Sequence, residues 1–257
     1  MPSPGRPSTP APGAPTTGRP GAGPVTGGAT PRAGLPLTFE RQATSKQRLQ
    51  IDWDFPLPAV SDKQALQRNA ALARIRGNDP RPLLVLRECE RCQGTDRALL
   101  SRNQPNDRTA LLTRWFHCVK LPGHVVDPAH PFHELFGGES PPHLLLLDAD
   151  SDQPVPFDGA QSQAELWATM MAVLRRAYVL DPEAAMKKLV QMLDHFDHLD
   201  SMKLTYEQQL DQILQKQGAD SEAARTLQQK LARLAAQKTE MLEREKRLSD
   251  LQLRKKA

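Results

Sequence analysis

Short apolar runs separated by polar turns set the pattern of the first two thirds of the chain. Residues 83–86 and 144–147 are unbroken apolar runs, and 116–121 is a mostly apolar run that ends at a Pro-Gly pair. Runs of this length suit strands that are buried on both faces of a sheet. Residues 154–157 predict a further strand at the sheet edge, because proline cannot donate to a ladder of hydrogen bonds.

Between these runs the apolar residues recur at helical spacing. Ser61 and Gln64 have the spacing of a capping box, which predicts the start of the first helix. Pro105 separates the second predicted helix from the third. The predicted helices span approximately 62–76, 95–100, 106–115, 127–136 and 161–179. Strands and helices then follow in the order βαβαββα, which predicts an α/β domain with a central mixed sheet flanked by helices.

The last part of the chain has a different pattern. Asp181-Pro182 is a strong helix start, and apolar residues beyond it recur every three or four positions, with a charged interruption at Lys203. Gly218 divides this part into two helices of similar length, about 183–217 and 221–255. We expect an α-helical hairpin or coiled coil over residues 181–257. Because each apolar stripe is narrow, this part is also a candidate for homo-oligomer formation.

The first 36 residues are mainly Pro, Gly, Thr, Ser and Ala, with no acidic residue before Glu40 and no aromatic residue before Phe39. Such a composition cannot bury enough apolar surface to fold, so we expect a disordered N-terminal tail over 1–36. The α/β domain is expected over residues 50–180. Because its sheet is complete before Asp181, we expect that domain to fold without the C-terminal helices.

The composition narrows the possible functions. Apolar residues make up 39% and aromatic residues 5% of the chain, so part of it is expected to lie outside any core. The 34 basic residues nearly balance the 30 acidic ones, which argues against nucleic acid as a partner. No signal-like or membrane-spanning apolar segment occurs. Three cysteines, an odd number, fit a reducing compartment, so we expect a cytoplasmic protein.

Candidate chemistry follows the first predicted strand. Cys89 and Cys92 form a C-x-x-C pair directly after residues 83–87, and a helical pattern begins at Thr95. A C-x-x-C pair at a strand-to-helix junction is typical of a redox motif. A helix N-terminus and nearby cations lower the pKa of a thiol, and the thiolate is the reactive form.

These features resemble the thioredoxin-like family over roughly residues 50–180. The resemblance is carried by five segments in order: Trp53, the helix residues Ala65-Leu66 and Ala70-Ala71-Leu72, the strand Pro82-Leu-Leu-Val, the pair Cys89 and Cys92, and Pro142 ahead of Leu144–Leu147. It implies the family's fold and thiol–disulfide exchange with a protein partner, without a cofactor. It also implies that Pro142 is cis and lies against the two cysteines.

Three details depart from that family. The attacking cysteine usually stands ten residues after the strand-leading proline, and counted from Pro82 that is Cys92, which would give a Cys-x-x-Thr site ending at Thr95. The buried acid expected on the first strand is replaced by Leu86. The residue before the expected cis proline is Pro141, which has no N–H to offer a substrate peptide.

The candidate site residues are therefore Cys89, Cys92 and Pro142, with two alternatives to redox chemistry. One is a non-catalytic scaffold or assembly protein, in which an inactive thioredoxin-like domain and the coiled coil bind other proteins. The other is zinc binding by the two cysteines and two of five further residues. Those residues are His117, Cys118, His124, His130 and His133. His195 and His198, on one helix face beside two aspartates, are better explained as solvated.

Overall fold

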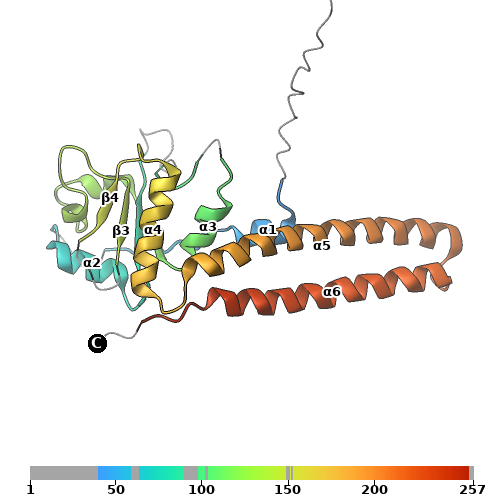
Figure 1. The fold of residues 1–257 in the computed structure, drawn as a ribbon. Helices are drawn as coiled ribbons and strands as arrows, with labels where there is room; N and C mark the ends of the chain where they lie inside the picture. Colours follow the sequence, from blue (N-terminus) through green and yellow to red (C-terminus); the bar gives the residue numbers. More distant parts are fainter. Residues whose placement is uncertain are drawn as a thin grey trace, which may run out of the picture. The chain divides into compact units, whose positions relative to one another are not determined.

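The computed structural model describes residues 40–58, 64–89, 98–101, 104–148, 151 and 153–254, and Glu40–Ala257 form one compact unit (Figure 1). The predicted tail over 1–36 lies outside the described residues. The helices and strands, in chain order, are α1 (Ala43–Arg48), α2 (Arg68–Arg76), β1 (Leu83–Arg87), α3 (Asp107–Thr113), β2 (His117–Leu121), the 3-10 turns η2 (Gly123–Val126) and η3 (His133–Leu135), β3 (Leu144–Leu147), β4 (Val155–Phe157), α4 (Gln163–Ala177), α5 (Pro182–Gln217) and α6 (Glu222–Ser249).

The four strands form one mixed sheet in the order β2-β1-β3-β4. β1 and β2 are parallel, whereas β3 is antiparallel to both β1 and β4. The four predicted strands and the edge position of β4 are confirmed. The prediction of an α/β fold with a central mixed sheet flanked by helices is thus confirmed.

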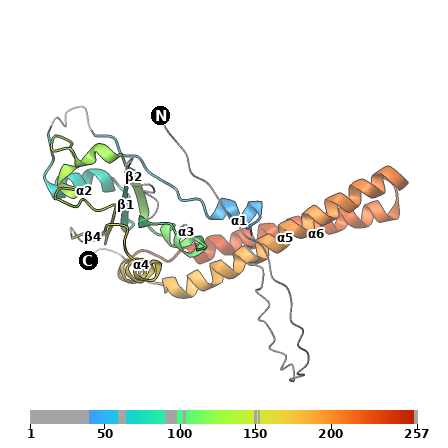
Figure 2. The ribbon, with the colours of Figure 1, turned by 90° about the horizontal axis from the view of Figure 1, so that it is seen from above.

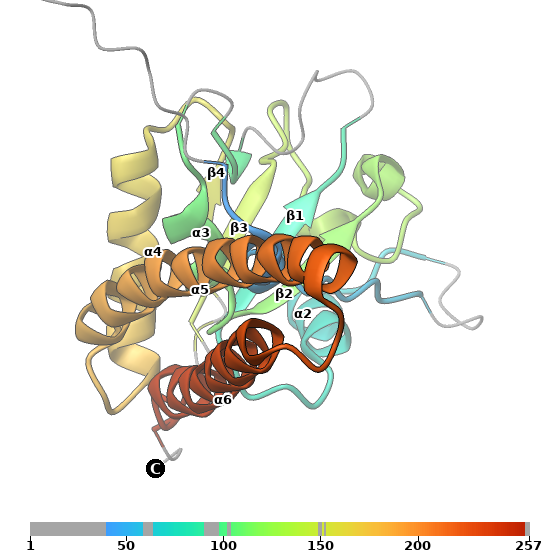
Figure 3. The same ribbon diagram turned by 90° about the vertical axis from the view of Figure 1, so that its right-hand side faces the viewer.

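Two apolar cores lie on opposite faces of the sheet. Leu84 and Leu86 of β1 pack with residues of α3, α4 and α5, whereas Leu83 and Val85 pack with α2 and the segment around η2 and η3. Figure 3 shows α4 and α2 on opposite sides of the sheet. All five residues of β1 are buried, which explains why its sequence has no alternation of polar and apolar residues.

The start of α2 differs from the prediction. The helix begins at Arg68 and not near 62, and Ser61 of the expected capping box lies outside the described residues. The Leu66 N–H donates to Pro131 O at 3.0 Å, so this part of the chain is hydrogen-bonded to a distant loop and does not continue the helix. Gln64 of the expected capping box therefore lies outside α2.

A second helix prediction is wrong. The crossover helix over 127–136 is replaced by the separate 3-10 turns η2 and η3. Pro128 and Pro131 lie inside the predicted span, where each removes a backbone donor and obstructs an α-helix. The helix predicted over 95–100 lies partly outside the described residues, and over 98–101 the chain forms a 3-10 conformation followed by a turn and no α-helix.

The C-terminal part is a helical hairpin, with α5 and α6 side by side in Figures 1 and 3. The Asp181 side chain caps α5 by accepting from the Glu183 and Ala184 N–H groups, as Asp-Pro predicted. The predicted boundary at Asp181 is a helix start, but the core continues across it. Six large side chains after that boundary belong to the same apolar cluster as β1 and β3. They are Met186, Leu189, Met192, Leu193, Phe196 and Leu251.

Short helix α1 lies beside α5 and joins the hairpin to the α/β part (Figure 2). Arg41, just before α1, pairs with Asp107 of α3 at 2.7 Å and with Asp194 and Asp197 of α5 at 2.6 and 2.7 Å. Arg48 pairs with Glu245 of α6 at 3.0 Å. We call residues 41–48 the N-terminal clasp.

The clasp explains two charged residues in the apolar stripe of α6. Glu245 accepts from both Arg48 and Arg114, and its side chain is only 12% exposed. Lys238 donates to Thr44 Oγ1 and to Asp200. Burial raises the pKa of Asp200, but hydrogen bonds from Thr44 and Lys238 outweigh burial and hold that pKa below its ordinary value.

The end of α6 also differs from the prediction. The helix stops at Ser249, and the chain then pairs with the α4–α5 connection through an antiparallel bridge between Tyr178 and Leu253. The Trp115 Nε1–H donates to Ser249 O at 2.8 Å, and the Tyr178 hydroxyl donates to Trp115 O at 2.7 Å. Backbone hydrogen bonds to the connection thus replace the last predicted helical turn.

Candidate functional site

Cys89 lies at the carboxyl end of β1, where the ladder to β2 continues beyond the strand. The Glu88 N–H donates to Leu121 O at 2.8 Å, so the ladder reaches the residue before Cys89. Gly123 approaches this segment so closely that a Cβ on it would lie 3.0 Å from Glu88 O. Cys89 is partly buried, and Cys92 lies outside the described residues.

The pairing of β1 with β3 brings the predicted proline segment to the motif. Beyond the two strands the pairing continues, because the Arg87 N–H donates to His143 O at 2.8 Å. If this antiparallel register continued for two more residues, Cys89 would lie opposite Pro141, with Pro142 diagonal to it. The configuration of the peptide bond before Pro142 stays a prediction.

Arg87 is the residue of this region that sequence reasoning missed. It is only 7% exposed, although it ends a strand of apolar residues. Its Nε donates to Pro142 O at 2.9 Å and its Nη2 to Pro141 O at 3.0 Å. No described carboxylate forms an ion pair with it. The sequence signal that could have identified Arg87 is a charged residue within a strand that is otherwise apolar and buried.

His143 is the third partner of Arg87, with 3.2 Å between Arg87 Nη2 and His143 Nδ1. Because a guanidinium can only donate, Nδ1 accepts and the ring proton lies on Nε2. Burial and the neighbouring Arg87 charge lower the pKa of His143, and burial lowers the pKa of Arg87. The imidazole is therefore neutral near pH 7, and Arg87 supplies the positive charge beside the proline segment.

Two other charges among the described residues at this end of the sheet form an ion pair. Lys120 of β2 lies 3.0 Å from a Glu88 carboxylate oxygen, and the two side chains are 25% and 46% exposed. The Lys120 ammonium also lies 6.0 Å from the centre of the Trp53 ring. This pair is more exposed than Arg87, so solvent screens it more strongly.

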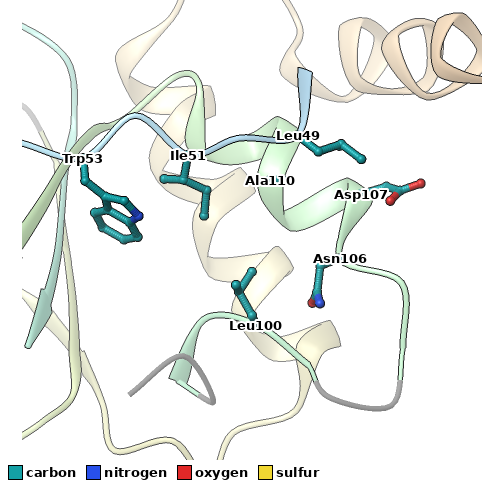
Figure 4. A pocket seen from close by; sticks show the side chains of 7 residues that line it. All are labelled: Leu49, Ile51, Trp53, Leu100, Asn106, Asp107 and Ala110. Atoms are coloured by element: carbon teal, nitrogen blue, oxygen red, sulfur yellow. The ribbon is translucent and has the colours of Figure 1, made fainter. Parts of the chain in front are cut away.

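A pocket of about 360 Å³ lies beyond Trp53 (Figure 4). Ile51 and Leu100 point toward each other across it. The residues that line it are Leu49, Ile51, Trp53, Leu100, Asn106, Asp107 and Ala110. Its polar groups already have partners, because Asn106 bonds the backbone of Ser101 and Asp107 binds Arg41. The pocket is thus mainly an apolar depression between the Ile51 segment and α3.

The residues proposed for zinc do not form a site within the part of the chain that the structure describes. Cys118 is a free thiol, 2% exposed, and burial raises its pKa to about 12. The rings of His124 and His130 contact each other edge to face, and His133 Nδ1 lies 2.9 Å from Val126 O. These histidines stabilise the loop that replaces the predicted crossover helix.

The histidines of α5 do not form a metal site with its aspartates. Asp194 and Asp197 bind Arg41 of the clasp. His195 and His198 line a second pocket, of about 320 Å³, between α5 and α6. The aspartates thus have a structural partner, which the sequence pattern did not suggest.

Comparison of the chain with protein-family models, curated proteins and solved structures finds no match. Among the described residues, no helix combines the length and the apolar character needed to span a membrane.

Proposed function

We propose that this protein is a thioredoxin-like thiol–disulfide oxidoreductase that acts through Cys89 and Cys92. The observation that carries the proposal is the pairing of β1 with β3, which continues to Arg87 and His143; extended by two more residues, the same register would set Cys89 opposite Pro141 and diagonal to Pro142. A C-x-x-C pair with a proline segment across from it is the arrangement that the family resemblance implies. The strand order β2-β1-β3-β4 supports the same assignment.

The reaction needs only the two thiols and an external reductant. The thiolate of one cysteine attacks a sulfur of a substrate disulfide, the S–S bond breaks, and the released sulfur leaves as a thiolate that takes a proton from water. The second cysteine then attacks the mixed disulfide and releases the other substrate thiol. The substrate gains two electrons, the chain retains a Cys89–Cys92 disulfide, and an external dithiol reduces that disulfide again.

Two residues make this proposed enzyme differ from an efficient reductase. Leu86 is completely buried where a buried acid would accept the proton of the resolving thiol. Pro141 has no N–H for a substrate strand, although its carbonyl already binds Arg87. We therefore expect slow turnover and a substrate held mainly by side-chain contacts, in a reducing compartment such as the cytoplasm.

The test is a redox titration of the full-length protein with mass-spectrometric mapping of each thiol. Cys89 and Cys92 should form a reversible disulfide while Cys118 stays reduced, because the Cys118 thiol is buried. Cys89→Ser and Cys92→Ser should each abolish reduction of a disulfide protein such as insulin, with Cys118→Ser as the matched control. Thiols that stay free under strong oxidant contradict the proposal.

A second candidate function is protein assembly through the hairpin, and the exposure of its far half supports it. Leu204 and Leu214 of α5 are 55% and 37% exposed, whereas α5 residues nearer the sheet are buried. Light scattering of full-length protein tests this function. Leu204→Asp with Leu214→Asp should lower the mass of an oligomer that uses this surface, and Asp211→Asn is an exposed control on the same helix.

A further inference from the structure

Arg87 has an environment that a structural arginine rarely has. It is a charged residue on a central strand, with three neutral acceptors: Pro141 O, Pro142 O and His143 Nδ1. A buried charge is costly when no opposite charge accompanies it. Carbonyl dipoles reduce that cost but leave the positive field of the guanidinium in place. That field favours a negative charge on any group nearby.

Cys89 is the group that the backbone brings into this field. The Glu88 N–H to Leu121 O hydrogen bond keeps the chain extended beyond Arg87. Side chains two residues apart in an extended chain lie on the same face, about 7 Å apart along the strand. Arg87 and Cys89 therefore share the face of the sheet occupied by Leu83 and Val85.

Among the described residues, the other titratable groups around Cys89 do not replace Arg87. Glu88 points to the opposite face and is paired with Lys120. His143, on the β3 side, is neutral near pH 7. Asp158 after β4 raises the pKa of His143, but burial and Arg87 together keep that pKa below its ordinary value. The His124 ring, next to Gly123, contacts the His130 ring edge to face.

We infer that Arg87 is a positioning residue that stabilises the thiolate of Cys89 and makes Cys89 the attacking cysteine. The same guanidinium holds the Pro141–Pro142 segment across from Cys89 through its two carbonyl contacts. The inference rests on the proposed function for the chemical use of the thiolate, although the thiolate itself can be measured without any substrate. It assigns the attack to Cys89, whereas the spacing after Pro82 would assign it to Cys92.

The pH dependence of alkylation tests this inference. Reduced full-length protein is treated with iodoacetamide at a series of pH values, and the peptides containing Cys89 and Cys92 are followed separately by mass spectrometry. In the wild type, Cys89 should react first, with a thiol pKa well below the ordinary value of about 8.5. Arg87→Gln should slow the alkylation of Cys89 at pH 7 by up to about tenfold, the largest effect that one pKa unit has on the thiolate fraction.

Two further variants separate charge from structure. Arg87→Lys keeps the charge but not the paired contacts to both carbonyls, so the rate of Cys89 alkylation should stay close to wild type while turnover with a protein disulfide falls. Lys120→Met removes a different cation at the same end of the sheet, one that is already paired with Glu88. This change should alter the rate of Cys89 alkylation less than twofold.

The possible results are distinguishable. A wild-type Cys89 pKa at or above about 8.5, or equal losses of Cys89 reactivity in Arg87→Lys and Arg87→Gln, overturns the role of Arg87. The wild-type measurement decides even where a variant fails to fold. A low Cys89 pKa combined with no Cys89–Cys92 disulfide in the redox titration would support the role of Arg87 while refuting the oxidoreductase.

Discussion

Replacing Phe196 tests whether the hairpin and the sheet are one folding unit. Phe196 lies on α5, after the predicted boundary at Asp181, yet it is 1% exposed within the apolar cluster that includes β1 and β3. The Arg48 guanidinium of the clasp lies 5.3 Å from the centre of its ring. Phe196→Ala therefore removes contacts that join α5, the clasp and the cluster on that face of the sheet.

The expected loss is large. Truncation of a buried phenylalanine to alanine costs about 3–5 kcal/mol, and loss of the cation–π contact with Arg48 adds about 0.5–1 kcal/mol. For a unit of this size each kcal/mol lowers the melting temperature by about 2–4 °C. We therefore expect the melting temperature of Phe196→Ala to fall by about 10 °C or more. Gln208→Ala, at an exposed position of the same helix, should change stability by less than about 0.5 kcal/mol.

Two optical signals make the assay specific. The three tryptophans, Trp53, Trp115 and Trp167, all precede Asp181, so fluorescence reports on the α/β part, while far-UV circular dichroism is dominated by the long helices α5 and α6. In Phe196→Ala both signals should shift together, as in a two-state transition. A fluorescence midpoint that stays at the wild-type temperature while the helical signal moves would refute a shared core.

Other contacts give three further predictions. Glu245→Gln should lower the free energy of unfolding in urea by about 2 kcal/mol, because the carboxylate binds two arginines, whereas Glu183→Gln at an exposed pair should cost less than about 1 kcal/mol. Because the pKa of Asp200 is lowered on folding, its contribution is complete above about pH 3.9 and is lost as pH falls through the folded pKa; Asp200→Asn should flatten that part of the stability curve. Removing residues 181–257 should leave a chain that shows no cooperative unfolding transition by circular dichroism. The six large side chains lost with this segment contribute about 9–18 kcal/mol by their burial, as much as the net stability of a domain. A cooperative transition of the truncated chain would contradict a continuous core.

The pattern of apolar residues was enough to locate the strands and the long helices. Residues 83–87 and 144–147 were predictable because a strand buried on both faces needs an uninterrupted apolar run. Asp181 and Gly218 mark the two ends of α5, since a cap and a glycine with positive φ (79°) act through the local backbone. The position of Cys89 after β1 was likewise a local property of the sequence.

Other features depended on residues far apart in the chain, and the sequence alone could not pair them. Just before α2 begins, the chain is hydrogen-bonded to Pro131, and the charges at Lys238 and Glu245 in the apolar stripe are explained by the clasp at residues 41–48. Arg87 gains its significance only from the antiparallel pairing with β3. Local signals determine where helices and strands occur, because they act over a few residues, whereas the folded chain decides which charges meet and which core continues past Asp181.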